Sequence, residues 1–185
     1  NYSIYNGSSW TTAKVAYNGN AGTVNAVDSA MLSDGTAILV YTVRTGEDVT
    51  STETFYTVIG TDGNAVTTGR LTNDSYTDTN AQVTAVGNQF IVGWYSEHAA
   101  GEEGNTDETV VSHDIGLARI NANGSVDASF PESIGGTAAA KIGSDFHFSA
   151  PAGCERLSDL SIVWSQQKES DKAEDEGGLT PVKVQ

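Results

Sequence analysis

Residues 81–94 read AQVTAVGNQFIVGW, and this stretch decides the fold class. In its first half small, polar and β-branched residues alternate, as they do in a half-buried strand. Gly87 and Asn88 form a turn signal, and the apolar run from Phe90 to Trp94 predicts a second, buried strand. The stretch therefore predicts a strand, a turn and a strand that ends in an aromatic residue.

The same pattern occurs twice more in the chain. Residues 25–41 read NAVDSAMLSDGTAILVY and form one further copy. The other copy joins residues 146–151 (FHFSAP) to residues 157–164 (LSDLSIVW). Each copy ends in an aromatic residue, namely Tyr41, Trp94 or Trp164. Self-similarity of this kind predicts a repeat architecture.

The length of the repeat favours a β-propeller, whose blades are antiparallel sheets that bury their faces against neighbouring blades. The repeats run approximately over 24–80, 81–143 and 144–185, the last of them incomplete, and residues 1–23 end a preceding one. We therefore expect one all-β domain or domain fragment over residues 1–185, a partial β-propeller of about three to four antiparallel blades. A β-sandwich is the alternative, because it also has short alternating strands and needs no repeat.

Incomplete repeats at both ends of the array lead to an expectation about partners. A propeller closes with about 4–8 blades, and an open arc would leave apolar sheet faces in water. We expect the remainder of its own polypeptide or a second copy of the chain to cover these faces. Trp10 and the strand from Pro181 to Gln185 belong to the incomplete repeats and are the expected participants.

Further strands and turns follow from the residues between the three copies. Alternation over Thr54–Ile59 and over Gly116–Ile120 predicts two strands, followed by the turn pairs Asp62-Gly63 and Asn123-Gly124. Such pairs supply the positive φ angles that tight turns need. No segment carries a helical period over about ten residues, so we expect no long helix.

A resemblance to a known family rests on two of these segments. Gly87–Trp94 and Asn121–Gly124 are similar to the repeats of bacterial extracellular β-propeller proteins, in which a glycine, an aliphatic run and a tryptophan are followed by an acidic loop, a strand and an Asp/Asn-Gly turn. Gly35–Tyr41 has tyrosine in place of the tryptophan, and the third copy lacks the glycine. The resemblance implies a propeller fold and an extracellular, cell-surface or secreted location. A fainter similarity to sialidase-type propellers fails on spacing, because Ser33–Thr36 are contiguous.

The charge of the chain excludes several classes of partner. Among 185 residues, 24 are acidic and 9 are Lys or Arg, which gives a net charge of -15. Nucleic acids and anionic lipid surfaces are bound mainly through Lys and Arg clusters, so we expect neither as a partner. No apolar run approaches the roughly 20 residues that span a bilayer, so we expect no membrane insertion. Cys154 is the only cysteine, and no intrachain disulfide can form.

Signatures of catalysis are absent from the sequence, and we assign no catalytic residue. There is no nucleophile elbow, no zinc-binding Cys pair and no His-Glu-x-x-His. Cys154 precedes Glu155, whose charge opposes a reactive thiolate, so a structural role is favoured. His113-Asp114 forms a His-Asp pair that could hold a metal or transfer a proton, although a solvated strand end is the simpler interpretation. His147 alternates with Phe146 and Phe148 and is expected at the surface.

Carboxylates and aromatic rings are the remaining candidates for binding. Asp74 and Asp78 lie in an Asn- and Asp-rich turn, and hard oxygen donors on a loop suit Ca²⁺. They are the candidate metal ligands, although simple solvation of the loop would explain them too. Trp10, Tyr76 and Tyr95 are candidate platforms for a carbohydrate ligand, because rigid rings pack on the C–H faces of sugars.

These features favour a non-enzymatic recognition or scaffold module of a bacterial secreted or cell-surface protein, with a carbohydrate or protein ligand. The alternative is part of a propeller-fold enzyme that acts on glycosides through a carboxylate pair. A third interpretation is an intracellular propeller that binds a partner protein. A cluster of converging carboxylates and an Arg in a central pocket would favour the enzyme, and a propeller axis lined by aliphatic residues would favour the module.

Overall fold

A computed structural model describes residues 1–17, 19, 22–46, 52–98, 112–130, 133–135, 140–151 and 153–168. These residues form three antiparallel sheets. Sheet 1 contains β1 (Val24–Met31), β2 (Ala37–Arg44), β3 (Thr52–Ile59) and β4 (Ala65–Arg70). Sheet 2 contains β5 (Thr77–Val86), β6 (Gln89–His98), β7 (Ser112–Asn121) and β8 (Ser133–Gly135). Sheet 3 pairs β9 (Ala140–Ser149) with β10 (Ser161–Lys168).

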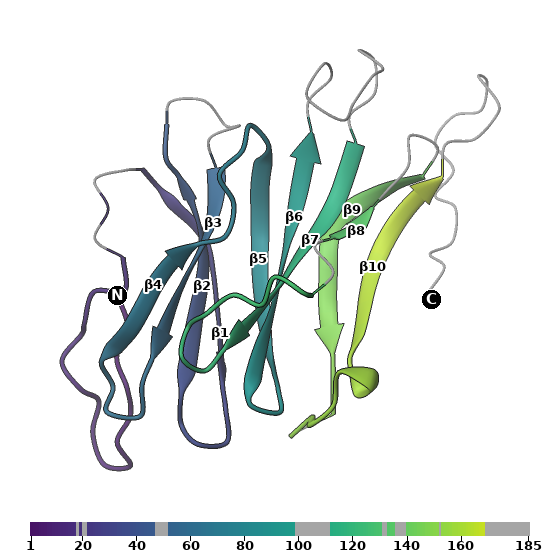
Figure 1. Ribbon diagram of the computed structural model, residues 1–185. Helices are drawn as coiled ribbons and strands as arrows, with labels where there is room; N and C mark the ends of the chain where they lie inside the picture. Colours follow the sequence, from purple (N-terminus) through teal and green to yellow (C-terminus); the bar gives the residue numbers. More distant parts are fainter. Residues whose placement is uncertain are drawn as a thin grey trace.

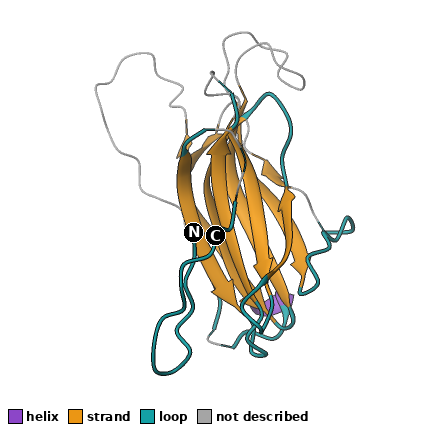
Figure 2. Ribbon diagram, turned by 90° about the vertical axis from the view of Figure 1, so that its left-hand side faces the viewer, coloured by secondary structure: helices purple, strands orange, loops and turns teal. Residues whose placement is uncertain are grey.

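Strand order within each sheet follows chain order, so that every sheet is a meander of neighbouring strands. Figure 1 shows sheet 1 at the left, sheet 2 in the centre and sheet 3 at the right. The strands run roughly along one direction, as the view from the side also shows (Figure 2). The all-β prediction is confirmed, and no sheet closes on itself in the part of the chain described above. Packing of sheet on sheet also fits the β-sandwich alternative.

Two of the predicted hairpin turns illustrate why these strands end where they do. Gly63 and Gly124 have φ angles of 73° and 85°, which residues with a side chain rarely adopt. Asp62 accepts a hydrogen bond from the backbone N of Asn64 at 2.9 Å, and Asn123 accepts one from Ser125 at 2.9 Å. The aspartate and the asparagine thus hold each turn while the glycine reverses the chain.

The core lies between the stacked sheets. Apolar side chains from sheet 1, such as Ile38 and Val58, pack against Phe90 and Val92 of sheet 2, and these four are fully buried. The opposite face of sheet 2 packs on sheet 3 through a second cluster that includes Phe146. Sheet 2 is therefore buried on both faces, which is why its strands read as apolar runs.

Hydrogen bonds between neighbouring sheets fix their relative positions. The backbone N of Val83 donates to Asp28 Oδ2 at 2.9 Å, which joins β5 to β1. The Tyr56 hydroxyl donates to the carbonyl oxygen of Gly124 at 2.8 Å. Gln82 Nε2 donates to the carbonyl oxygen of Phe146 at 2.6 Å, which joins sheet 2 to sheet 3.

The buried strand predicted for each of the three copies places seven alternate apolar residues in the core, and five of them are buried, namely Ile38, Val40, Phe90, Val92 and Trp94. The other two, Ile162 and Trp164, are half-buried. They lie on β10, which has a strand partner on one side only in sheet 3 and packs on sheet 2 with a single face. The predicted burial is therefore correct for the residues of sheets 1 and 2, whereas those of sheet 3 are less buried than predicted.

The end faces of the stack agree only in part with our expectation of large exposed apolar patches. On the outer face of sheet 1, Tyr41 and Phe55 are buried because Tyr17 of the N-terminal segment packs on them. On the outer face of sheet 3, Asp145 and His147 are exposed, and Val163, which pairs with His147, is half-buried. The exposed apolar side chains of Val24, Val27 and Met31 on β1 also lie on the outer face of sheet 1, because they pair with Val43, Tyr41 and Ala37 on that face. The predicted strand at 181–185 and the acidic segments 99–111 and 169–178 lie outside the described residues.

Helical structure is confined, among these residues, to a single 3₁₀ turn at Leu157–Asp159. This agrees with the expected absence of a long helix. Within the same ranges, no helix has the length and apolar character needed to cross a membrane.

Candidate functional site

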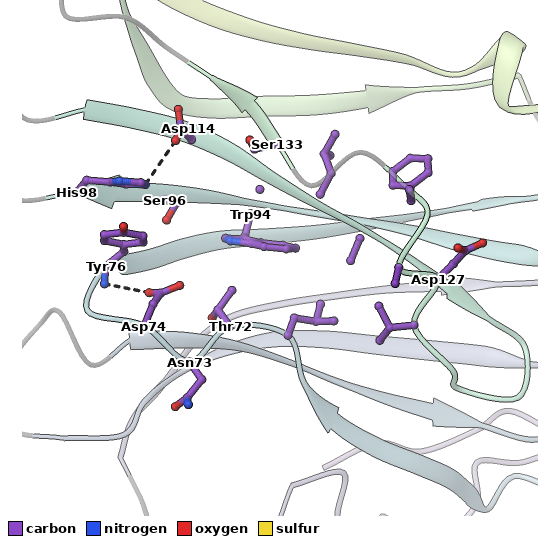
Figure 3. Close-up of a pocket in the computed structure, with 17 residues that line it drawn as sticks. Thr72, Asn73, Asp74, Tyr76, Trp94, Ser96, His98, Asp114, Asp127 and Ser133 are labelled. Atoms are coloured by element: carbon purple, nitrogen blue, oxygen red, sulfur yellow. Dashed lines mark hydrogen bonds and ion pairs between the residues drawn. The ribbon is translucent and has the colours of Figure 1, made fainter. Parts of the chain in front are cut away.

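A pocket of about 510 Å³ opens between the connection from β4 to β5 and the face of sheet 2 that looks toward sheet 1. Figure 3 shows Trp94 in its middle, Asp74, Tyr76, His98 and Asp114 around one end, and Asp127 at the other end.

Trp94 lies in the middle of the pocket and depends on a glycine beside it. Its indole lies over Gly116, which faces it across the pair of β6 and β7. A Cβ atom on Gly116 would come within 2.2 Å of Trp94 Cε2, so any other residue would displace the ring. Trp94 is only 9% exposed and also belongs to the core between sheets 1 and 2. The pocket therefore has a rigid aromatic wall.

A stacked pair of rings forms one end of the pocket. The ring centroids of Tyr76 and His98 are 3.6 Å apart, and the planes differ by 11°. His98 Nε2 lies 3.4 Å from Asp114 Oδ2, on the neighbouring strand β7. The backbone N of Tyr76 donates to Asp74 Oδ1 at 2.9 Å, which fixes the turn that carries Tyr76. The contacts with Asp74 and Asp114 thus hold the rings of Tyr76 and His98 in place.

At the opposite end, Asp127 is surrounded by donors. Arg119 forms an ion pair with it, and the backbone N and the hydroxyl of Ser129 donate to its Oδ1 at 2.9 and 2.6 Å. The hydrogen bonds from Ser129 and then the Arg119 guanidinium lower the pKa of Asp127 to about 2. The Arg119 guanidinium also lies over the Phe130 ring, 5.3 Å from its centroid. The carboxylate of Asp127 is therefore ionised at neutral pH and already has hydrogen-bond donors in Ser129 and Arg119.

A cluster of three carboxylates borders the pocket behind Thr72 and Ser96. Glu53 comes from β3, Asp74 from the connection after β4, and Asp78 from β5. One oxygen of each lies within 4.8 Å of the others. Glu53 and Asp78 are buried, at 2% and 0% exposure, while Asp74 is exposed. The chain thus brings together acidic groups from two sheets where it crosses from one to the other.

The two buried carboxylates are only half satisfied. Arg70 Nη2 lies 2.6 Å from Glu53 Oε1, and the Ser96 hydroxyl donates to Asp78 Oδ1 at 2.7 Å. The second oxygens, Glu53 Oε2 and Asp78 Oδ2, are buried and have no hydrogen-bond partner among the described residues.

Burial raises the pKa of Asp78 to about 7, and the negative charges of Asp74 and Glu53 add to this increase, while the hydroxyl groups of Thr72 and Ser96 oppose it. A buried carboxylate oxygen without a hydrogen-bond partner lowers the stability of the fold unless it is protonated or binds a cation.

The structure places the predicted binding residues at different points of the molecule. Tyr76 and Asp74 line the pocket, and Asp78 lies in the adjoining cluster. Trp10 is 69% exposed in the N-terminal hairpin, where it packs on Tyr5 with the ring centroids 5.5 Å apart, and it does not line this pocket.

Tyr95 needs a correction. It is buried in the cluster between sheets 2 and 3, because it points to the opposite face from its neighbour Trp94, and so it offers no exposed platform. Its hydroxyl hydrogen-bonds with Nδ1 of His113.

The remaining candidate residues from the sequence are His113, Asp114, His147 and Cys154. His113 and Asp114 are consecutive in β7 and therefore point to opposite faces, so they do not form a catalytic pair with each other. Asp114 approaches His98 instead. His147 is exposed, as expected. Cys154 is buried, and its thiol donates to the carbonyl oxygen of Arg156 at 3.3 Å.

Reasoning from sequence missed two members of the site. Glu53 directly precedes the apolar alternation that we used to predict a strand, and β3 is buried at every position including Glu53. An acidic residue attached to such a strand was the available signal. We interpreted Trp94 as a core residue, which it is, but it also lines the pocket.

Comparison with known proteins gives no relative: no family model matches the chain, and no curated protein matches it. The resemblance to bacterial extracellular propeller repeats therefore stays a prediction.

Proposed function

We propose that the protein is a non-enzymatic recognition module that binds carbohydrate in the pocket beside Trp94. One observation carries this proposal: the rings of Trp94 and Tyr76 lie in the same pocket as the carboxylates of Asp74, Asp114 and Asp127. A sugar offers C–H faces that pack on rings and hydroxyl groups that donate to carboxylates. Both kinds of partner are present within one concave site.

The size and charge of the pocket narrow the ligand class. A volume of about 510 Å³ suits a small ligand such as one or two sugar units, since ligand pockets run from about 300 to 1,000 Å³. The acidic lining and the net charge of -15 repel anions. We therefore expect neutral sugars or amino sugars rather than sialylated, uronic or sulfated ones.

The scaffold that we propose for this pocket is a partial β-propeller. Three successive antiparallel meanders, stacked face to face in chain order, support blades more than they support the two layers of a sandwich. The exposed apolar side chains of Val24, Val27 and Met31 along β1 would then face further blades. Those blades would come from the remainder of its own polypeptide or from a second copy.

An extracellular or cell-surface location in bacteria is part of the same proposal. It is supported by the excess of acidic residues, the low Lys and Arg content and the single, buried cysteine. The rival function is glycoside hydrolysis, since three carboxylates line the pocket and hydrolysis needs a pair of them.

A glycan array probed with the full chain tests the proposal. We expect the wild type to bind neutral glycans, and Tyr76→Ala to weaken that binding at least about tenfold through loss of the ring. Trp10→Ala is the matched control, because it removes an exposed aromatic outside the pocket.

Three results would overturn the proposal: no glycan bound, equal loss in both variants, or hydrolysis of the bound glycan during incubation. Hydrolysis would establish the enzyme instead.

A further inference from the structure

We propose that Glu53, Asp74 and Asp78 bind a Ca²⁺ ion that ties sheet 1 to the first strand of sheet 2. The three residues come from β3, the β4–β5 connection and β5, so one ion would cross-link segments from both sheets. This inference shares Asp74 with the carbohydrate proposal, but its test concerns the protein without any ligand in its pocket.

The spacing of the oxygens fits calcium. Calcium takes oxygen ligands at about 2.3–2.6 Å, so two oxygens on one ion can lie up to about 5 Å apart. One oxygen from each of the three carboxylates lies within 4.8 Å of the others. Mg²⁺ demands a near-ideal octahedron at about 2.0–2.1 Å and is usually held by one or two carboxylates, so a cluster of three carboxylates suits calcium better.

Two buried oxygens supply an independent reason for a ligand at this place. Glu53 Oε2 and Asp78 Oδ2 each lack a hydrogen-bond partner among the described residues, although their residues are 2% and 0% exposed. The other oxygen of each carboxylate is already used, by Arg70 and Ser96 respectively. Unsatisfied carboxylate oxygens are expensive in a protein interior, and a cation compensates them directly.

The local charge balance favours a divalent cation. The cluster carries three carboxylates, and within the described ranges the only guanidinium that pairs with it is that of Arg70, on Glu53. Ionisation of all three leaves an excess of two negative charges, which one Ca²⁺ ion neutralises. Asp74 is exposed and therefore gives an ion a route in from solvent. The hydroxyl groups of Thr72 and Ser96 lie beside Asp78, and both residues also line the pocket.

A single proton between Glu53 and Asp78 is the competing explanation for the unsatisfied oxygens. It would need two carboxylates and would not account for Asp74, the third carboxylate that the geometry brings to the same point. Calcium titration distinguishes the two explanations, because a proton shared by two carboxylates creates no calcium affinity.

The experiment is isothermal titration of CaCl₂ into the chelator-treated full chain at pH 7.5, with wild type, Asp74→Asn and Asp78→Asn. Asp62→Asn is the matched control. Asp62 is exposed and accepts a turn hydrogen bond from the residue two positions later at 2.9 Å, as Asp74 does, but lies outside the cluster. Thermal melting of each variant without calcium checks that it folds.

We expect one saturable calcium site with a dissociation constant below about 1 mM. Asp74→Asn and Asp78→Asn should each weaken it at least about tenfold, as loss of a ligand does, and Asp62→Asn should change it less than about twofold. Asp74→Asn alters an exposed residue and keeps the test valid if Asp78→Asn fails to fold.

Absence of calcium binding, or binding that both cluster variants leave unchanged, would overturn the site. Equal weakening by Asp62→Asn would also overturn it, since that result indicates a general charge effect. Magnesium bound as tightly as calcium would overturn the assignment to calcium.

Discussion

Asp78 and Asp127 lie beside opposite ends of the same pocket, and their surroundings have opposite effects on them. Asp127 accepts hydrogen bonds from Ser129 and pairs with Arg119, which lowers its pKa to about 2. Asp78 is buried beside two other carboxylates, has one unsatisfied oxygen, and its pKa rises to about 7. The protein therefore stabilises one aspartate by itself and leaves the other to a proton or a cation. Of the two ends, only the Asp78 end needs something from outside the chain.

Replacing Trp94, which lies between the two ends of the pocket, should have the largest effect on stability. Trp94→Ala deletes a buried indole from the core between sheets 1 and 2 and should lower the free energy of unfolding by about 3–5 kcal/mol. Urea denaturation measures this change. Trp10→Ala, at an exposed position, should change it by less than about 0.5 kcal/mol. A small effect at Trp94 would mean that the two ends are not separated by a packed core.

The effect of Asp78→Asn on the melting temperature should reverse its sign when calcium is added. Without calcium at pH 7.5, the variant removes a buried, unsatisfied charge and should melt at a higher temperature than the wild type. With calcium at about 100 times the wild-type dissociation constant, the wild type gains about 2.7 kcal/mol, and the variant, which binds at least about tenfold more weakly, should gain at most about 1.4 kcal/mol. Melting curves with chelator and with calcium test this. Asp127→Asn should show no such crossover, and a crossover there would remove the contrast between the two ends.

Acid titration of the metal-free protein should sharpen the same contrast. For Asp78 the folded pKa of about 7 exceeds the ordinary aspartate value of 3.8, so its contribution to stability falls as pH rises from about 4 to 7. For Asp127 the folded pKa of about 2 lies below 3.8, so its contribution is lost as pH falls from about 4 to 2. Melting temperatures against pH, compared with Asp78→Asn and Asp127→Asn, should show opposite slopes. Parallel slopes would contradict us.

Arg119→Ala should have the smallest effect. The guanidinium is partly exposed, and water can replace much of what it gives to Asp127, while Ser129 keeps its own hydrogen bonds. We expect a slight decrease in melting temperature that calcium does not alter. A decrease that calcium restores would show that the two ends of the pocket are coupled.

Much of the strand content could be predicted because local sequence determines it. Residues 89–95 and 36–43 alternate or run apolar between turn signals, and the structure places β6 and β2 there. The boundary predicted at residue 81 was less accurate, because β5 begins at Thr77 and passes through an irregular pairing between Thr79 and Gln82. Asn80 has a positive φ of 52° at that point, which no turn pair in the sequence announces.

The site was only partly predictable because it combines residues from separate strands. Asp74 and Asp78 are neighbours in sequence and share a polar turn, so composition was enough to identify them. Glu53 joins them only through the packing of β3 beside β5, which no local pattern encodes. Tyr95 and Trp94 are adjacent in sequence, yet only Trp94 reaches the pocket, because the two point to opposite faces of sheet 2.

Strand order has a consequence for the way in which the chain folds. Every hydrogen-bonded pair joins strands that are adjacent in the sequence, so pairing requires the closure of connecting loops and no long crossover. Stacking of sheet 1 on sheet 2, in contrast, brings together distant residues such as Ile38 and Phe90. Contacts that are far apart in sequence form more slowly. We therefore expect hairpins to acquire protection against hydrogen exchange early in refolding and the side chains of the core to lock later, a delay that pulse labelling of amides beside Trp94 fluorescence would resolve.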